Sequence, residues 1–192
     1  MPHGLRELIL RNRSYRRFCS DRPVTTEQLE ELVDLARLSP SAANLQPLKF
    51  LLSNTLGKNE LIFSCLAWAA YLKDWPGPDQ SERPAAYILI LGDKEIAKEF
   101  WCNHGIAAQS ILLGAVEVGL GGCILAAMQR EKLRRLLTIP ARYEILLAIA
   151  LGEPKERVVL VDAVDGEIKY WRDAAQTHYV PKRPLSEIIL DL

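Results

Sequence analysis

Hydrophobic positions along the chain follow two patterns, a helical spacing and short continuous runs. In residues 25–38, apolar side chains recur every three or four positions, as on one face of a helix: Leu29, Leu32, Val33 and Ala36. Thr25 and Gln28 form a capping-box pair at the start of this segment. Similar patterns predict further helices at residues 5–12, 59–72, 94–100, 104–118 and 131–137.

Short apolar runs predict strands at residues 49–53, 85–91, 123–126 and 145–151. Asp165-Gly166 is typical of a two-residue hairpin turn, so residues 158–164 and 167–171 are expected to pair. The helix at residues 104–118 is apolar nearly all round, which places it in the core or against a partner. Helices and strands that alternate over 192 residues indicate one layered domain of the α/β or α+β class.

The charge balance argues against some partners. Lys and Arg number 24, and so do Asp and Glu, so the formal net charge is zero. A protein held to nucleic acid by phosphate contacts needs a positive excess. The longest apolar stretch, residues 105–120, is interrupted by Gln109, Ser110 and Glu117 and is too short to span a bilayer. We therefore expect neither nucleic acid nor membrane as a partner.

The four cysteines are widely spaced and form no CxxC pair or zinc-type cluster with the histidines. We interpret them as reduced thiols, which predicts a cytoplasmic protein without a metal site. No histidine has a Ser, Cys or Asp partner at the spacing of a catalytic triad. No side chain is therefore predicted to act as a catalytic nucleophile.

Basic residues gather near both ends of the chain. Arg11, Arg13, Arg16 and Arg17 lie near the C-terminal end of the first predicted helix, and the pair at residues 182–183 precedes an apolar tail. Guanidinium groups match phosphate oxygens, so either group could grip a phosphate. However, cations near a helix C-terminus also stabilise the helix through its macrodipole. A basic pair in a tail is commonly just exposed to solvent. From charge alone, we favour these structural interpretations over a phosphate site.

Three other segments each have two interpretations. Residues 39–47 contain Asn44 and Gln46, whose amides suit the edge of a heterocycle but also suit an ordinary connector. Residues 119–126 are rich in glycine, which allows either the close approach of a planar ligand or a helix cap and turn. A group of aromatic residues belongs either to the core or to the wall of a site: Trp68, Tyr71 and Trp75.

Taken in chain order, these motifs resemble the FMN-dependent nitroreductase family. The Arg-Arg-Ser-x-Arg-x-Phe motif of the family is similar to residues 12–18, and its Ala-Pro-Ser-x-x-Asn-x-Gln-Pro motif to residues 39–47. Pro23-Val24 precedes a helix as in the family, and Gly-Ile-Ala-Ala-Gln leads into Gly-Leu-Gly within residues 105–121. Departures are Asn12 for an arginine, Leu48 for an aromatic and Ala126 for a glycine.

The resemblance implies an α+β fold with a three-layer α/β/α sandwich and a mostly antiparallel central sheet. It covers most of the chain, so residues 1–192 are expected to form a single FMN-binding domain. The family assembles as an intertwined homodimer with FMN at the interface. Residues 155–192 are accordingly expected to form an arm that reaches the partner subunit.

The resemblance also implies the residues that bind FMN. One group would hold the phosphate and ribityl chain: Asn12, Arg13, Ser14, Arg16, Lys182 and Arg183. A second group would line the flavin from the other subunit: Pro40, Ser41, Ala42, Asn44 and Gln46. The backbone of Ile124 and Leu125 would face the flavin ring, and Trp68, Tyr71 and Trp75 would contact the substrate.

The implied function is an FMN-dependent oxidoreductase that takes hydride from NAD(P)H. Electrons would pass to a flat small-molecule acceptor such as a nitroaromatic or a quinone, and the cofactor would carry the chemistry. The same fold also supports flavin destruction, dehalogenation or dehydrogenation, because a fold does not determine a reaction. A further alternative is a flavin-binding module without turnover, which the departures from the family motifs favour.

Overall fold

A four-stranded antiparallel sheet forms the centre of the protein in the computed structural model, which describes residues 4–191. Its strands lie in the order β1-β2-β4-β3, with these bounds: β1 Leu48–Ser53, β2 Ala86–Asp93, β3 Gly121–Leu125 and β4 Tyr143–Gly152. All eight residues of β2 are buried. The central strands are therefore covered on both faces, as their continuous apolar runs indicate.

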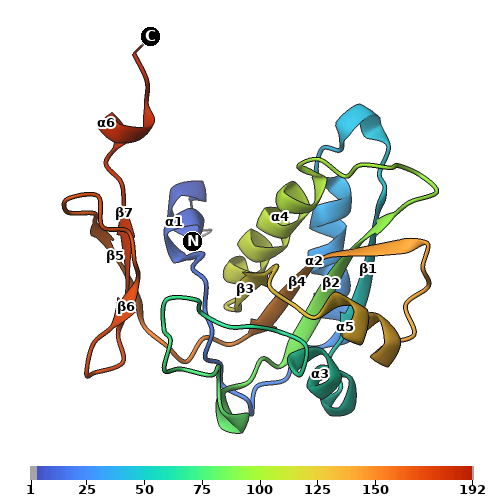
Figure 1. Cartoon of the computed structure of the whole chain (residues 1–192), viewed down its shortest axis with the longest axis horizontal. Helices are drawn as coiled ribbons and strands as arrows, with labels where there is room; N and C mark the ends of the chain where they lie inside the picture. Colours follow the sequence, from blue (N-terminus) through green and yellow to red (C-terminus); the bar gives the residue numbers. More distant parts are fainter. Residues whose placement is uncertain (1–3, 192) are drawn as a thin grey trace.

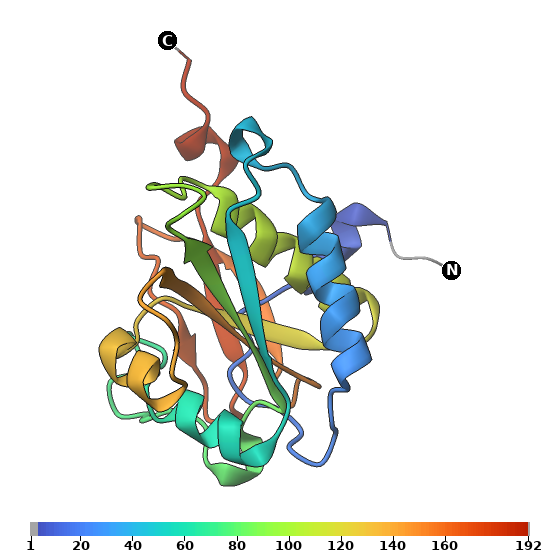
Figure 2. The ribbon, with the colours of Figure 1, turned by 90° about the vertical axis from the view of Figure 1, so that its right-hand side faces the viewer.

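Helices cover both faces of this sheet (Figure 2). On one face lie α2 (Thr26–Leu38) and α4 (Asn103–Glu117), and their apolar side chains share a core cluster with those of β2 and β4. The opposite face is covered by α3 (Leu56–Phe63) and α5 (Arg130–Leu136). The predicted α+β three-layer architecture is confirmed. Within residues 4–191, no helix has the length and apolar character that a membrane span requires.

Small residues on α4 allow it to pack closely against α2. A Cβ atom built on Gly114 would lie 2.2 Å from Leu35 Cδ1 and 3.1 Å from Leu32 Cδ2. The helices could not approach this closely with a larger side chain at that position. The capping box of α2 is present as predicted, because Thr25 accepts from the Gln28 backbone and Gln28 accepts from that of Thr25.

One predicted helix is shorter than expected, and another is wrong. The helix expected at residues 59–72 starts earlier and ends at Phe63, since Trp68 folds back to lie 5.8 Å from the Phe63 ring. Residues 94–100 form no helix, because Asp93 caps a single turn and Phe100 covers Gly92 instead. In both segments, apolar side chains that are spaced as in a helix pack instead against other parts of the chain.

The C-terminal part forms a second, three-stranded sheet beside the main body (Figure 1). It comprises β5 (Val158–Asp162), β6 (Trp171–Arg172) and β7 (His178–Lys182), in the order β5-β7-β6. The predicted hairpin is wrong. The turn at Asp165-Gly166 has the positive φ angles of such a turn, yet β5 pairs with β7 in parallel instead of with residues 167–171.

The first and the last helix of the described residues lie beside this second sheet. The N-terminal helix α1 (Leu5–Arg11) lies between it and α4, and the short helix α6 (Leu185–Ile188) projects from the body (Figure 1). Leu185, Ile188, Ile189 and Leu190 are between 59% and 74% exposed. The second sheet with its tail is called the C-terminal arm below and comprises residues 155–191.

Candidate cofactor site

The segment that follows α1 runs in extended form beside the edge of the main sheet. The Tyr15 N–H donates to the Gly122 carbonyl at 3.0 Å, which ties the segment to β3. Further on, Phe18 is completely buried, and its N–H donates to the Glu82 carbonyl. Successive side chains of an extended segment point to opposite sides, so this segment presents two different faces.

The segment borders a cavity of about 290 Å³. The segment contributes Asn12, Arg13, Ser14 and Arg16. Alternate residues of β7, which stand on one side of the strand, complete the wall: His178, Val180 and Lys182. Gln109 and Leu112 from α4, Ile124 from β3 and Tyr170 also line it. The structure thus brings Lys182 to the predicted arginine cluster from the far end of the chain.

The arginines of this cavity have unused hydrogen-bond donors. The Arg13 Nη2 atom donates to the Ile9 carbonyl at 2.6 Å, but its Nε atom is buried without a partner within residues 4–191. The same is true of Arg16 Nε. Burial lowers the pKa of Arg13, since desolvation disfavours its charge. A buried guanidinium donor without an acceptor is costly, and an anionic oxygen would satisfy it.

A second cavity, of about 220 Å³, adjoins the first. Arg16, Ile124 and Tyr170 line both cavities and therefore stand at their junction. Leu125 and Cys123 of β3 and the ring of Trp68 form its other walls. Burial raises the pKa of the Cys123 thiol, which stays protonated as a small apolar group. The second cavity offers an apolar slot next to the cationic one.

The predicted Pro-Ser-Asn-Gln segment lies elsewhere in this chain. Pro40, Ser41 and Gln46 line a third cavity of about 220 Å³ between α2 and α4, which shares no residue with the first two. The Ala42 N–H donates to Asn103 Oδ1, and the Asn44 amide oxygen accepts from Gln46 Nε2 at 3.2 Å. Within one subunit these residues therefore do not join the arginine cluster.

Three other predicted residues lie outside the first two cavities. Arg183 is exposed and donates to Glu187 at 2.8 Å, one turn further along the tail. The Tyr71 ring lies 4.9 Å from that of Tyr170, and Trp75 lies under the Arg172 guanidinium at 4.3 Å. The aromatic group therefore contacts the C-terminal arm, and only Trp68 lines the second cavity.

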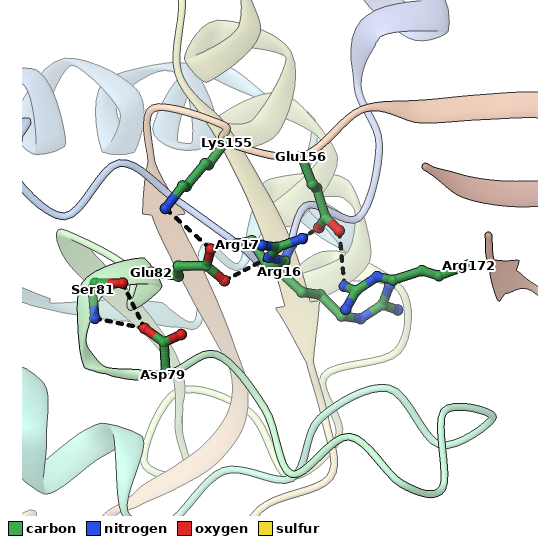
Figure 3. Close-up of polar contacts among 8 residues, drawn as sticks. All are labelled: Arg16, Arg17, Asp79, Ser81, Glu82, Lys155, Glu156 and Arg172. Carbon is green, nitrogen blue, oxygen red and sulfur yellow. Dashed lines mark hydrogen bonds and ion pairs between the residues drawn. The ribbon is translucent and has the colours of Figure 1, made fainter. Parts of the chain in front are cut away.

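Two buried carboxylates, Glu82 and Glu156, lie close to the arginine segment (Figure 3). No sequence motif predicted them. Arg17 donates to both oxygens of Glu82, at 2.5 and 2.6 Å, and Lys155 lies 3.1 Å from the same carboxylate. These hydrogen bonds lower the pKa of Glu82 to about 2. Glu156 accepts from the Arg16 backbone N–H and from Arg172. Together they anchor the extended segment to the arm.

His178 and Tyr170 also belong to the site and were not predicted. His178 is 1% exposed, and burial with two nearby guanidinium groups, Arg16 and Arg172, lowers its pKa to about 4. The Tyr170 ring lies 5.0 Å from Arg16 Cζ and 5.1 Å from the His178 ring. The alternation of His178, Val180 and Lys182 is the signal in the sequence that could have found this wall.

The described residues contain no cluster of His, Cys, Asp or Glu with the geometry of a metal site. All four cysteines are free thiols, and Cys65 and Cys123 are buried. The described side chains that line the first two cavities are cationic, neutral polar, aromatic and apolar, and none of them is a carboxylate. This set suits the binding of a planar ligand that carries an anionic group.

Comparison with known proteins shows the family to which this chain belongs. Residues 9–153 match the model of the nitroreductase family, so the chain belongs to this family. A provisionally named NADH dehydrogenase/NAD(P)H nitroreductase of Methanothermobacter thermautotrophicus is 31% identical over 166 residues, which cover 83% of this chain and 82% of that protein. The corresponding protein of Archaeoglobus fulgidus is 29% identical over 167 residues, or 83% and 90% of the two chains.

Solved structures share the fold. A nitroreductase family protein from Streptococcus pneumoniae has a TM-score of 0.69 at 18% identity and covers 98% of this chain and 100% of its own. An FMN-dependent nitroreductase from Clostridium difficile has a TM-score of 0.64 at 24% identity, with coverage of 78% and 87%. The family resemblance predicted from the motifs is confirmed, and so is the predicted fold.

Proposed function

We propose that this protein is an FMN-dependent oxidoreductase that uses NAD(P)H to reduce a flat acceptor such as a nitroaromatic or a quinone. Membership of the nitroreductase family supports this assignment. The observation that carries the proposal is the convergence of Arg13, Arg16 and Lys182 on one cavity beside an apolar slot. A cytoplasmic location is part of the proposal and rests on the widely spaced cysteines.

The donor set fits FMN. Arg13 and Arg16 carry buried Nε donors without partners, and Lys182 adds a third positive charge to the same cavity. Charge-assisted hydrogen bonds from such groups suit a phosphate dianion. The adjoining slot between Trp68 and β3 would take the flat ring system, with the backbone of Ile124 and Leu125 at its wall.

Bound FMN would supply two-electron redox chemistry between NAD(P)H and the acceptor. The residues of this chain would bind and orient it. Arg16 stands at the junction of the two cavities, where its charge would favour negative charge on a reduced ring. Trp68, Cys123 and Leu125 form an apolar wall that would limit the entry of water.

We further propose a homodimer. The exposed apolar tail supports it, since Leu185, Ile188, Ile189 and Leu190 are each more than half exposed. Exposed apolar surface of this extent is typical of an interface. In such a dimer, Pro40, Ser41 and Gln46 of one subunit would approach the flavin of the other, which accounts for their distance from the arginine cluster within one chain.

The test is the visible spectrum of the protein purified without added flavin, before and after anaerobic addition of NADH or NADPH. We expect the two bands of oxidised flavin, bleached by at least one donor. A flavin that neither donor bleaches would contradict the reductase and favour a flavin-binding module without turnover. A colourless protein that takes up no added FMN would contradict the cofactor assignment. Sedimentation equilibrium tests the dimer separately.

A further inference from the structure

His178 is held firmly in the wall of the first cavity. It is the first residue of β7, the central strand of the C-terminal arm, and its backbone pairs with Val158 on one side and Arg172 on the other. The backbone N–H donates to the Arg157 carbonyl at 2.8 Å. Because the strand is fixed on both sides, the side chain has a fixed direction. That direction places it beside Arg16.

The imidazole contacts the Arg16 guanidinium as a neutral acceptor. Its Nε2 atom lies 3.5 Å from Arg16 Nη1, at the outer limit of a hydrogen bond. A guanidinium has only donors, so this contact is favourable only when Nε2 carries a lone pair. The surroundings of the ring favour that state, because burial first of all, and then the positive charges of Arg16 and Arg172, lower the pKa of His178. Lys182 also lines the cavity, and Glu156 is held by Arg172.

The contacts of Arg16 leave part of its guanidinium without a hydrogen-bond partner among the described residues. Nη1 is held between the His178 ring and the Ser14 carbonyl, at 3.5 and 3.3 Å. The Tyr170 ring covers one face of the group. The Nε atom is buried and has no partner within residues 4–191. In Arg17 the Nε edge of the guanidinium binds a carboxylate, because its Nε and Nη2 atoms donate to both oxygens of Glu82.

We propose that His178 is a positioning residue, whose neutral imidazole holds Arg16 in the cavity wall so that the unpartnered part of its guanidinium can receive an anionic oxygen of the ligand. This inference rests on the proposed FMN site and assigns one of its determinants to the C-terminal arm. His178 lies beyond the residues that match the family model. A histidine that merely fills the core would contribute to stability without acting through Arg16.

A double-mutant cycle separates these two roles. The dissociation constant for FMN is measured by quenching of flavin fluorescence in the wild type, H178N, H178L, R16M and R16M/H178L. We expect H178L to weaken binding about 10-fold and H178N, which keeps an acceptor, to stay within about 3-fold of the wild type. R16M should weaken binding about 50-fold, and adding H178L should change this by less than about 2-fold.

Two results would overturn the inference. One is a double mutant weakened by the product of the single losses, about 500-fold, which would show that His178 acts independently of Arg16. The other is an equal loss in H178N and H178L, which would show that the acceptor is irrelevant. Thermal unfolding of each variant identifies any that fails to fold.

A second measurement needs no flavin and keeps the inference testable if FMN does not bind at all. The chain has three histidines, so the His178 imidazole resonance is identified by its loss in H178N. In the wild type it should keep its neutral position from pH 8 to pH 5, because the pKa is lowered to about 4. In R16M its titration should move up by about one pH unit. An unchanged titration would show that Arg16 does not face His178.

Discussion

Arg16 and Arg17 are neighbours in the chain, yet their guanidinium groups have opposite surroundings. Arg17 is paired through two hydrogen bonds with Glu82, whose carboxylate also contacts Lys155. Arg16 faces a cavity, and its Nε atom has no partner within residues 4–191. The extended backbone between Tyr15 and Phe18 directs the two side chains to opposite sides. One arginine therefore serves the fold, and the other is free for a ligand.

The contrast shows how one basic segment combines two tasks. The Glu82 network joins the segment to the η2 turn (Gln80–Glu82) and to the start of the arm, so the backbone at Arg16 is fixed before any ligand arrives (Figure 3). Glu156 adds to this by accepting from the Arg16 N–H. A preorganised donor loses less entropy on binding than a mobile one.

The largest expected effect is on stability, in R17M. Removing Arg17 leaves the Glu82 carboxylate buried with Lys155 as its remaining cation. Breaking a buried ion pair on one side typically costs 3–5 kcal/mol, and Lys155 keeps the loss near the lower limit, at about 3 kcal/mol. Urea unfolding measures it, and FMN affinity should stay within about 2-fold of the wild type, because Glu156 still accepts from the Arg16 N–H and holds that backbone in place. A fully stable R17M that loses FMN would reverse the assignment of the two arginines.

R16M is the matched variant and should show the opposite result. It removes charge-assisted hydrogen bonds worth about 2.3 kcal/mol to an anionic ligand, so FMN should bind about 50-fold more weakly. The free energy of unfolding should change by less than about 1 kcal/mol, because Arg16 forms no ion pair in the described part of the chain. Fluorescence titration and urea unfolding measure the two quantities. A large loss of stability with FMN affinity intact would contradict the comparison.

The Glu82 network also predicts a pH dependence. The folded-state pKa of Glu82 is lowered from 4.5 to about 2, so its contribution is complete above pH 4.5 and is lost as the pH falls towards 2. The stability difference between the wild type and E82Q should therefore be largest near pH 6 and shrink steadily below pH 4.5. Unfolding free energies at pH 6, 4 and 3 measure it. A difference that stays constant down to pH 3 would show that Arg17 does not stabilise the carboxylate.

The sequence predicts the central layers better than the arm. The helical spacing of Leu29 and Leu32 and the continuous run at residues 145–151 predict α2 and β4, because these elements bury their apolar faces against the sheet. The arm depends on pairing between β5 and β7, which are separated by a long connection. Nothing local in residues 163–177 favours that pairing over a hairpin, so the contacts of Tyr170 and His178 were missed.

In the candidate site too, residues within a local motif could be predicted, and residues that depend on long-range contacts could not. The cluster of Arg13 and Arg16 could be found from its motif, and Lys182 from the resemblance. Glu82 and Glu156 could not, since a buried carboxylate looks like any surface carboxylate until its partner is known. Side chains alternate between the two sides of a strand, so His178, Val180 and Lys182 share one side and line the cavity. This alternation would have predicted that Lys182 lines the cavity and that its neighbour Arg183 does not.

The pair Lys182 and Arg183 repeats the comparison on a smaller scale. Both were predicted to bind FMN, but only Lys182 lines the cavity, while Arg183 is held by Glu187 on the exposed tail. K182A should weaken FMN binding about 5-fold, since an exposed charge pair contributes about 1 kcal/mol at most. R183A should change it less than 2-fold, and raising the salt concentration should reduce the K182A effect. An equal loss in both variants would mean that the tail moves Arg183 towards the cofactor when the dimer forms.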